Sequence, residues 1–250
     1  MRYFIKLSYK GTCFHGWQRQ NNAPSIQEEI ERALSTILRE DVSIVGCGRT
    51  DTGVHAHEYF AHFDFNKSIE LKILVFKLNS FLVKDIAVQD IFPVNNRAHT
   101  RFDALQRSYR YFINYDKDPF NTDSSWYLYN TKLDVGKMNQ AAQQLLNFKD
   151  FSAFEKIGSD NKTSICDVSF AKWLSDSNHI YFEIRADRFL RNMVRAIVGT
   201  LVEVGKGNMT EKEFIEVIKS GNRSKAGSSV PAQGLFLWSV HYSLDIRINE

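Results

Sequence analysis

The organisation of this 250-residue chain follows from one stretch, Arg107-Ser108-Tyr109-Arg110-Tyr111-Phe112-Ile113-Asn114-Tyr115. Its odd-numbered positions from 109 onward are three tyrosines and an isoleucine, and this alternation predicts a β-strand with one aromatic face. The strand opens a series of elements in the order βαββαβ, and the residues before it predict the same order. We therefore expect two units of similar architecture that meet near residue 100.

The first series occupies the N-terminal part of the chain. Periodicity predicts strands over 2–9, 42–48, 57–65 and 86–92, and helices over 25–39 and 68–82. The first helix has a clear beginning, because Ser25 and Glu28 have the spacing of a capping box. Tyr59, Ala61 and Phe63 share one face of the third strand, which we expect to be buried.

The second series begins with the quoted strand. It continues with strands over 163–173, 179–186 and 235–242 and helices over 134–147 and 188–204, and the capping box of Thr210 and Glu213 adds one more helix. Both series match the split βαβ arrangement of ferredoxin-like units. We expect an α+β protein with antiparallel sheets, an N-terminal subdomain over 1–100 and a C-terminal subdomain over 101–250.

Composition excludes several classes of protein. Hydrophobic residues make up 43% of the chain and charged residues 24%, which is unlike a disordered or collagen-like chain. No apolar run approaches the ~20 residues that a membrane helix needs, and the alternating N-terminus is not typical of a signal peptide. The three cysteines form no Cys-x-x-Cys pair, which suits a reducing compartment. We expect a cytoplasmic globular protein with no membrane partner.

The charge is concentrated in two short segments. Lys and Arg number 32 and Asp and Glu 29, so the net charge is only +3. Four arginines, at 97, 101, 107 and 110, surround Asp103, and four more, at 185, 188, 191 and 195, surround Asp187. Two basic segments on a nearly neutral chain indicate a polyanionic partner.

The densest irregular stretch is Gly46-Cys47-Gly48-Arg49-Thr50-Asp51-Thr52-Gly53-Val54-His55-Ala56, between two predicted strands. Gly, Asp and Thr favour turns, so a long hairpin turn is the simplest interpretation. A phosphate-binding loop is disfavoured, because Asp51 stands at the sixth position of the glycine pattern and a strand follows. The third interpretation makes Asp51 a functional carboxylate beside Arg49, and the residues alone leave turn and active-site loop both open.

Neighbouring histidines raise the question of a metal site. His57 and His62 are one residue too far apart for the helical His-Glu-x-x-His pair. On a strand, an odd and an even position lie on opposite faces. We therefore expect no metal ion here.

Two arginine patterns suit RNA but also have simpler interpretations. In the predicted helix 188–204, Arg188, Arg191 and Arg195 share the arc opposite an apolar stripe, which usually means a solvated face. Arg195 is expected in mid-helix beside the apolar edge, where its charge needs a carboxylate or phosphate partner. The run from Arg101 to Tyr111 interleaves arginines with aromatic rings, as RNA-binding surfaces do, but also as a strand with a tyrosine-rich core face does.

Five motifs together resemble a known family, that of tRNA pseudouridine synthase A. They are Phe14–Gln20 with Ser25-Ile26-Gln27 after it, Gly48–Ala56, Arg101–Tyr111, Phe189–Gly199 and Ala232–Leu237. The motifs extend over nearly the whole chain in the family's order. Thr52 departs from the family's usual alanine.

The resemblance implies an enzyme that isomerises uridine to pseudouridine in the anticodon stem-loop of tRNA, at tRNA positions 38, 39 and 40. It implies a homodimer with a central basic cleft between the subdomains, and no cofactor or metal. By position, Asp51 is the catalytic carboxylate, Tyr109 stacks on the target base and Arg195 pairs with Asp51. Arg49 would assist entry of the base, and Leu235 would form an apolar wall.

The remaining expected contacts are phosphate contacts from arginines of these motifs and basic segments. They are Arg19, Arg101, Arg107, Arg110, Arg188 and Arg191. Two other functions stay in view. A non-catalytic tRNA-binding protein or chaperone of the same fold would not need Asp51, Tyr109 and Arg195 together, and a zinc-dependent base deaminase would need paired cysteines and a His-x-Glu signature that this sequence lacks.

Overall fold

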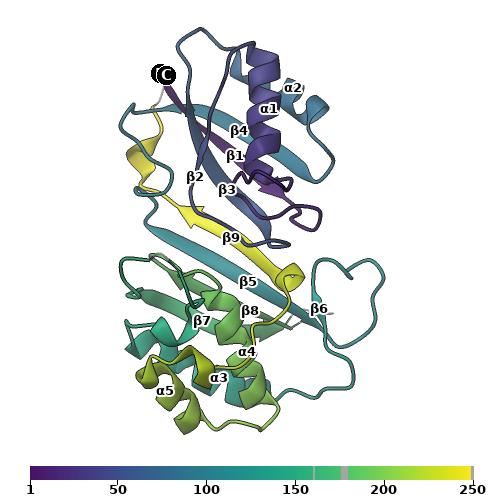
Figure 1. Cartoon of the computed structure of the whole chain (residues 1–250), viewed down its shortest axis with the longest axis vertical. Helices are drawn as coiled ribbons and strands as arrows, with labels where there is room; N and C mark the ends of the chain where they lie inside the picture. The colour runs from purple at the N-terminus through teal and green to yellow at the C-terminus, as the bar shows by residue number, and fades with distance from the viewer. Residues whose placement is uncertain (160, 176–179, 249–250) are drawn as a thin grey trace. The chain divides into compact units, whose positions relative to one another are not determined.

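The computed structural model describes residues 1–159, 161–175 and 180–248 (Figure 1). The chain forms two compact units. One holds Met1–Leu105 together with the segment from Leu237 onward, and the other holds Gln106–Phe236. The expected mixture of helices and mostly antiparallel strands is confirmed. In the described part of the chain, no helix is both long enough and apolar enough to cross a bilayer.

The first unit contains a sheet with the strand order β4-β1-β3-β9, and β2 pairs with β3. Its elements are β1 (Arg2–Tyr9), α1 (Ile26–Leu38), β2 (Val45–Gly46), β3 (His55–Asp64), α2 (Leu71–Phe81), β4 (Ile86–Val94) and the greater part of β9 (Leu235–His241). β1 is antiparallel to both neighbours, and Phe4 lies opposite His62 on one side and Phe92 on the other. Tyr59, Ala61 and Phe63 of β3 are buried, as the alternation predicted.

The second of the predicted strands, 42–48, is much shorter than expected. The strand β2 spans just Val45–Gly46, and one further backbone bond to β3, from Cys47 N to Phe60 O at 2.8 Å, follows it. The backbone groups just before it are bonded to side chains of α1: Val42 N donates to Ser35 Oγ at 2.9 Å and Ile44 N to Glu31 Oε1 at 3.0 Å. Because a helix already satisfies these groups, no neighbouring strand is needed to satisfy them.

The chain beyond Leu237 belongs with the first unit, although the sequence placed it in the second. Tyr242 explains this, because its ring packs edge-on against Phe4 and Phe60 at 5.5 and 5.2 Å. Arg247 continues the contact by pairing with Asp90. The last strand therefore packs on the core of a unit whose other strands lie more than 140 residues earlier.

The strand order in the second unit is β5-β8-β7, and β6 pairs with β5. Its elements are β5 (Gln106–Asn114), β6 (Trp126–Tyr127), α3 (Val135–Gln144), β7 (Val168–Ser175), β8 (Ile180–Ala186), α4 (Met193–Gly205) and α5 (Glu211–Ser220). Tyr111 and Ile113 of β5 are fully buried, in agreement with the predicted apolar face. β6 pairs with β5 in parallel and was not predicted, because two residues show no periodicity. Thr210 and Glu213 form the full capping box of α5.

α4 begins later than its apolar stripe suggested. Asn192 has φ 65°, in the left-handed region, so the right-handed helix starts only at Met193. The preceding turn is held by Arg188 N, which donates to Asp187 Oδ1 at 2.7 Å. The expectation that Arg188, Arg191 and Arg195 share a helical arc is therefore wrong. Only Arg195 is helical, and it lies in the first turn of α4.

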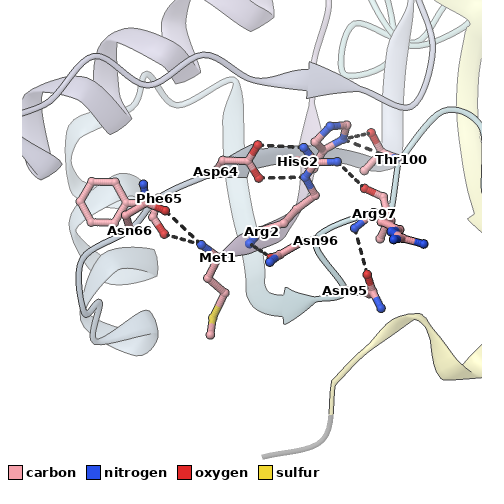
Figure 2. Close-up of polar contacts among 11 residues, drawn as sticks. Met1, Arg2, His62, Asp64, Phe65, Asn66, Asn95, Asn96, Arg97 and Thr100 are labelled. Atoms are coloured by element: carbon pink, nitrogen blue, oxygen red, sulfur yellow. Dashed lines mark hydrogen bonds and ion pairs between the residues drawn. The ribbon is translucent and has the colours of Figure 1, made fainter.

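A polar cluster ties the start of β1 to the loop after β4 (Figure 2). Arg2 donates to both oxygens of Asp64 at 2.8 Å and to Ala98 O at 2.9 Å. Beside it, His62 Nδ1 and Thr100 Oγ1 are hydrogen-bonded at 2.9 Å. Burial, followed by the charges of Arg2 and His99, lowers the pKa of His62 from 6.5 to about 4.

This shift predicts a pH-dependent stability. Because the pKa of His62 is near 6.5 in the unfolded chain and about 4 in the folded one, the unfolded state binds more protons between these values. Stability is therefore full above pH ~6.5 and is lost as the pH falls towards 4, by on the order of 2–3 kcal/mol from this residue. Urea unfolding from pH 7.5 to 4.5 should show the loss, and His62→Gln should reduce it. Part of the slope should remain, because burial and the charge of Arg2 also lower the pKa of His99. Asp64 titrates below this window, because Arg2 lowers its pKa. An unchanged slope in His62→Gln would contradict the assignment.

Candidate active site

The stretch from Cys47 to Val54 connects β2 and β3 and is a tight, anchored loop. Val54 N donates to Asp51 O at 3.1 Å, so residues 51–54 form a β-turn. Gly53 has φ 77°, which is the conformation that the third position of a type II turn requires. Asp51 is half-buried at the first position of this turn, and Arg49 is exposed. The interpretation of this stretch as a turn is therefore confirmed for residues 51–54. The interpretation as an active-site loop is compatible with such a turn and stays a prediction.

The loop is docked against the Phe14–Trp17 segment. Trp17 N donates to Thr50 O, and Gly53 N donates to Phe14 O, both at 3.3 Å. Gly16, with φ 87°, makes this approach possible: a Cβ at this position would lie 2.3 Å from Thr50 O. The segment Phe14–Trp17, with the sequence FHGW, is thus the surface against which the Asp51 loop packs.

Two buried tyrosines hold the loop from the strands beneath it. The hydroxyls of Tyr9 and Thr50 are hydrogen-bonded at 2.9 Å, and the Tyr59 hydroxyl donates to Gly48 O. The Trp17 ring stacks on that of Tyr59 with centroids 4.1 Å apart, and both rings are buried. The sequence assigned Tyr59 only to the core face of a strand. Its role as a support of the loop was missed, because period-2 patterns identify the face of a residue and not its hydroxyl partner.

In the second unit, Tyr109 lies on β5 and Arg195 in the first turn of α4. The Tyr109 ring meets Phe189 edge-to-face at 5.0 Å and 84°, which fixes the plane of the phenol. Arg195 Nε donates to Val230 O at 2.7 Å, while Val230 N donates to Arg195 O at 3.3 Å. These reciprocal bonds fix the direction of the guanidinium.

The segment that bonds Arg195 lies directly against α4 and then leads to Leu235. A Cβ on Gly199 would lie 1.9 Å from Ser228 O, so the motif glycine permits this backbone contact. The Tyr111 hydroxyl donates to Pro231 O at 2.9 Å, which ties the same segment to β5, and burial raises the pKa of Tyr111 well above its usual value. Leu235 follows at the start of β9 and is buried.

The arginines of the expected phosphate-binding set differ in their surroundings. Arg110 and Arg185 share the buried carboxylate of Glu183, with N–O distances of 2.8 and 2.6 Å. Arg107 donates to Asp187 O at 2.8 Å and Arg188 to Thr163 O at 3.3 Å. Among the others, Arg19 lies 3.6 Å from Glu31, and Arg101 and Arg191 are exposed. Phosphate contacts by all six remain predictions, and Arg110 has the strongest structural role.

Asp51 and Arg49 thus belong to one loop of the first unit, and Tyr109, Arg195 and Leu235 to the second unit. The pairing of Arg195 with Asp51 stays a prediction.

The histidines that raised the question of a metal site have other contacts. His57 stacks on Trp238 at 4.2 Å, and His62 bonds Thr100. Burial raises the pKa of the Cys166 thiol to about 12, which keeps this thiol protonated. Over the described residues, no group of three or more His, Cys, Asp or Glu side chains is arranged to hold a metal ion.

Comparison with known proteins places these observations in a family. Residues 141–243 match the family described as tRNA pseudouridine synthase. The chain is similar to tRNA pseudouridine synthase A of Bacteroides thetaiotaomicron, with 48% identity over 100% of this chain and 93% of the relative. It is also similar to the proteins of that name from Parabacteroides distasonis, with 50% identity over 96% of each chain, and Bacteroides fragilis, with 47% identity over 98% of each chain. The chain is thus a pseudouridine synthase, and it belongs to the tRNA pseudouridine synthase A family.

The docking of the Asp51 loop predicts a large effect of one methyl group. Gly16→Ala should destabilise the protein by about 2 kcal/mol or more, because the alanine must adopt a positive φ and its Cβ meets Thr50 O. Gly48→Ala, in the loop itself, is the matched control, because a Cβ there has nothing within 4 Å. Equal midpoints of urea unfolding for the two variants would show that the FHGW contact does not hold the loop.

Proposed function

We propose that this protein is an enzyme that isomerises uridine to pseudouridine in the anticodon stem-loop of tRNA, at tRNA positions 38, 39 and 40. The observation that carries the proposal is the anchored turn that holds Asp51, in a chain 47–50% identical to three proteins named tRNA pseudouridine synthase A. A simple turn does not need a loop that is supported by two buried tyrosines and a tryptophan. A catalytic carboxylate does need a fixed position, because small displacements of a reacting group reduce the rate steeply.

The reaction breaks the N1–C1′ glycosidic bond, turns the uracil and joins C5 to C1′. N1 gains a proton and C5 loses one, so the product is an isomer of the substrate. We propose that Asp51 starts the reaction, either by adding its carboxylate to C1′ or by removing the C2′ proton. The target base must first leave its stack, which costs a few kcal/mol.

The other site residues are proposed to act on the base and on Asp51. Tyr109 would stack on the detached uracil and relay the C5 proton, and its ring is already held by Phe189. Arg195 would pair with Asp51, with its orientation set by Val230. Arg49, exposed two residues before Asp51, would assist entry of the base, and Leu235 would form an apolar wall of the pocket.

The proposal extends to architecture and context. The first unit would supply Asp51 and the second Tyr109, Arg195 and Leu235. The element order β1-α1-β2-β3-α2-β4 and the strand order β4-β1-β3, with β2 on β3, support a ferredoxin-like first unit, and β5-β8-β7 supports the same for the second. We also propose that the enzyme is a cytoplasmic homodimer that works on tRNA without cofactor or metal.

The central test is Asp51→Asn. Asparagine is nearly isosteric and also favours turns, but it can neither add to C1′ as a carboxylate nor take the C2′ proton. We expect no detectable pseudouridine when tRNA transcripts are mapped at single-nucleotide resolution, with tRNA binding retained and stability within ~1 kcal/mol. Asp41→Asn, an exposed aspartate before β2, should keep wild-type turnover. One tenth of wild-type turnover in Asp51→Asn would refute the role of Asp51.

The arginines should separate into two kinds in a salt titration. Arg191→Gln should weaken tRNA binding similarly for all sequences and reduce the log–log salt slope by about one, as expected for one lost phosphate contact. Arg110→Gln should mainly lower the stability, because buried Glu183 loses one of two cationic partners. A slope that is unchanged in Arg191→Gln would remove this residue from the RNA-binding set.

A further inference from the structure

The loop between β4 and β5 is held as firmly as the Asp51 loop, although the proposed chemistry gives it no role beyond an arginine. Thr100, at its centre, is fully buried, and its hydroxyl bonds Val45 O and His62 Nδ1, both at 2.9 Å. The Tyr242 hydroxyl donates to Thr100 O at 2.6 Å. Figure 2 shows how His62 and Thr100 meet.

The first half of this loop is fixed by the start of β1. Arg2 N donates to Asn96 Oδ1 at 3.1 Å, and the Arg2 guanidinium donates to Ala98 O at 2.9 Å while it pairs with Asp64 (Figure 2). Backbone bonds within the loop, Ala98 N to Asn95 O at 2.8 Å and Asp103 N to His99 O at 3.0 Å, complete it. These hydrogen bonds therefore fix the conformation of the loop.

This structure presents one aromatic ring to solvent. Phe102 is 74% exposed. The His99 imidazole packs against its ring with centroids 4.3 Å apart, and the Arg101 guanidinium lies 5.6 Å from the ring centroid. His99 Nδ1 also accepts the backbone N–H of Arg101 at 3.1 Å and that of Phe102 at 3.4 Å, so the side chain beneath the ring also holds the backbone that carries it.

The charges around Phe102 indicate what the ring would meet. Arg97 and Arg101 are exposed in this loop. The acid nearest in sequence, Asp103, accepts a hydrogen bond from His99 N at 2.8 Å. An exposed aromatic ring beside cations suits a nucleotide. The ring can stack on any base, and the guanidinium can bind the phosphate of the nucleic-acid backbone.

We propose that Phe102 is a stacking surface for an unpaired nucleobase of the RNA substrate, with Arg101 directed to the adjoining phosphate. The identity of this RNA as tRNA rests on the proposed function. The assignment goes beyond the arginine contacts expected from the sequence, because it makes a neutral ring a determinant of affinity. It also gives the His62–Thr100 cluster a purpose, namely to hold that ring in place.

Three substitutions at one position test the proposal. Phe102→Trp keeps a stacking ring, Phe102→Leu keeps an apolar side chain without one, and Phe102→Ala removes both. Phe76→Ala is the matched control, because Phe76 is 72% exposed on α2 of the same unit. Affinity for an unmodified tRNA transcript is measured by filter binding at fixed salt, and folding by circular dichroism.

We expect Phe102→Trp to bind within about twofold of wild type, and both Phe102→Leu and Phe102→Ala to bind between about 5-fold and 100-fold more weakly, as for one lost stack. Phe76→Ala should bind as wild type does. Quenching of the new tryptophan's fluorescence by tRNA would support stacking directly. Wild-type affinity in Phe102→Leu would overturn the proposal in favour of a nonspecific apolar contact. Unchanged affinity in Phe102→Ala, with an altered sedimentation coefficient, would overturn it in favour of a protein interface.

Pseudouridine mapping with the wild-type enzyme separates this proposal from the proposed function. If wild type modifies the transcript but Phe102→Ala binds it normally, the stacking proposal fails and the proposed function stands. If wild type binds the transcript in a Phe102-dependent way without forming pseudouridine, the proposed function fails and the stacking surface stands.

Discussion

The approach of the Gly16 backbone to Thr50 O is the constraint on which the Asp51 loop of the first unit depends. Glycine is required there twice over, by a φ of 87° and by the lack of room for a Cβ. Because the two backbones touch, the Trp17 ring stacks on the ring of Tyr59, whose hydroxyl bonds the loop. The same contact therefore determines both the path of the Asp51 loop and the environment of the bonds that support it.

The second unit contains a similar close contact between a glycine and a backbone carbonyl near Arg195. Gly199 lets the backbone at Ser228 lie against α4, and Val230 then exchanges two hydrogen bonds with Arg195. In both units a glycine allows a close backbone contact of a loop, with a second loop in the first unit and with α4 in the second. One of the segments in contact carries or orients a charged residue of the proposed site. Such contacts are rigid, since a shift of either backbone would leave buried polar groups without partners.

The sequence predicted the long periodic elements well, and their ends less well. β1, β3 and β5 follow from alternation, and α5 from its capping box. The strand expected at 42–48 shrank to two residues, because side chains of α1 bond its backbone, and no local pattern reveals such long-range partners. The start of α4 moved because Asn192 adopts a left-handed conformation, which its sequence context does not require.

The candidate site could be assembled from the sequence only in part, and the roles of its residues stay predictions. Asp51, Tyr109 and Arg195 could be named from motifs, because the motifs carry side-chain identity. The supports of Asp51 could not, because Tyr9 and Tyr59 lie in strands where every aromatic residue has the same periodic pattern whether or not its hydroxyl bonds a loop. Phe102 could not be singled out either, because it belongs to a run that interleaves arginines with aromatic rings, and the sequence does not indicate which ring is exposed.

We infer that the position of Asp51, and not only its presence, depends on the tyrosine hydroxyls that bond the loop. The most direct test is the single-turnover rate of Tyr59→Phe with saturating enzyme, beside Tyr3→Phe as a control for loss of a phenol from another buried tyrosine of the same sheet. We expect a rate at least about tenfold lower in Tyr59→Phe, because a small displacement of a reacting group reduces the rate steeply. The Kd for tRNA should be unchanged, and the Tm should be close to that of Tyr3→Phe. Equal single-turnover rates in Tyr59→Phe and wild type would contradict it.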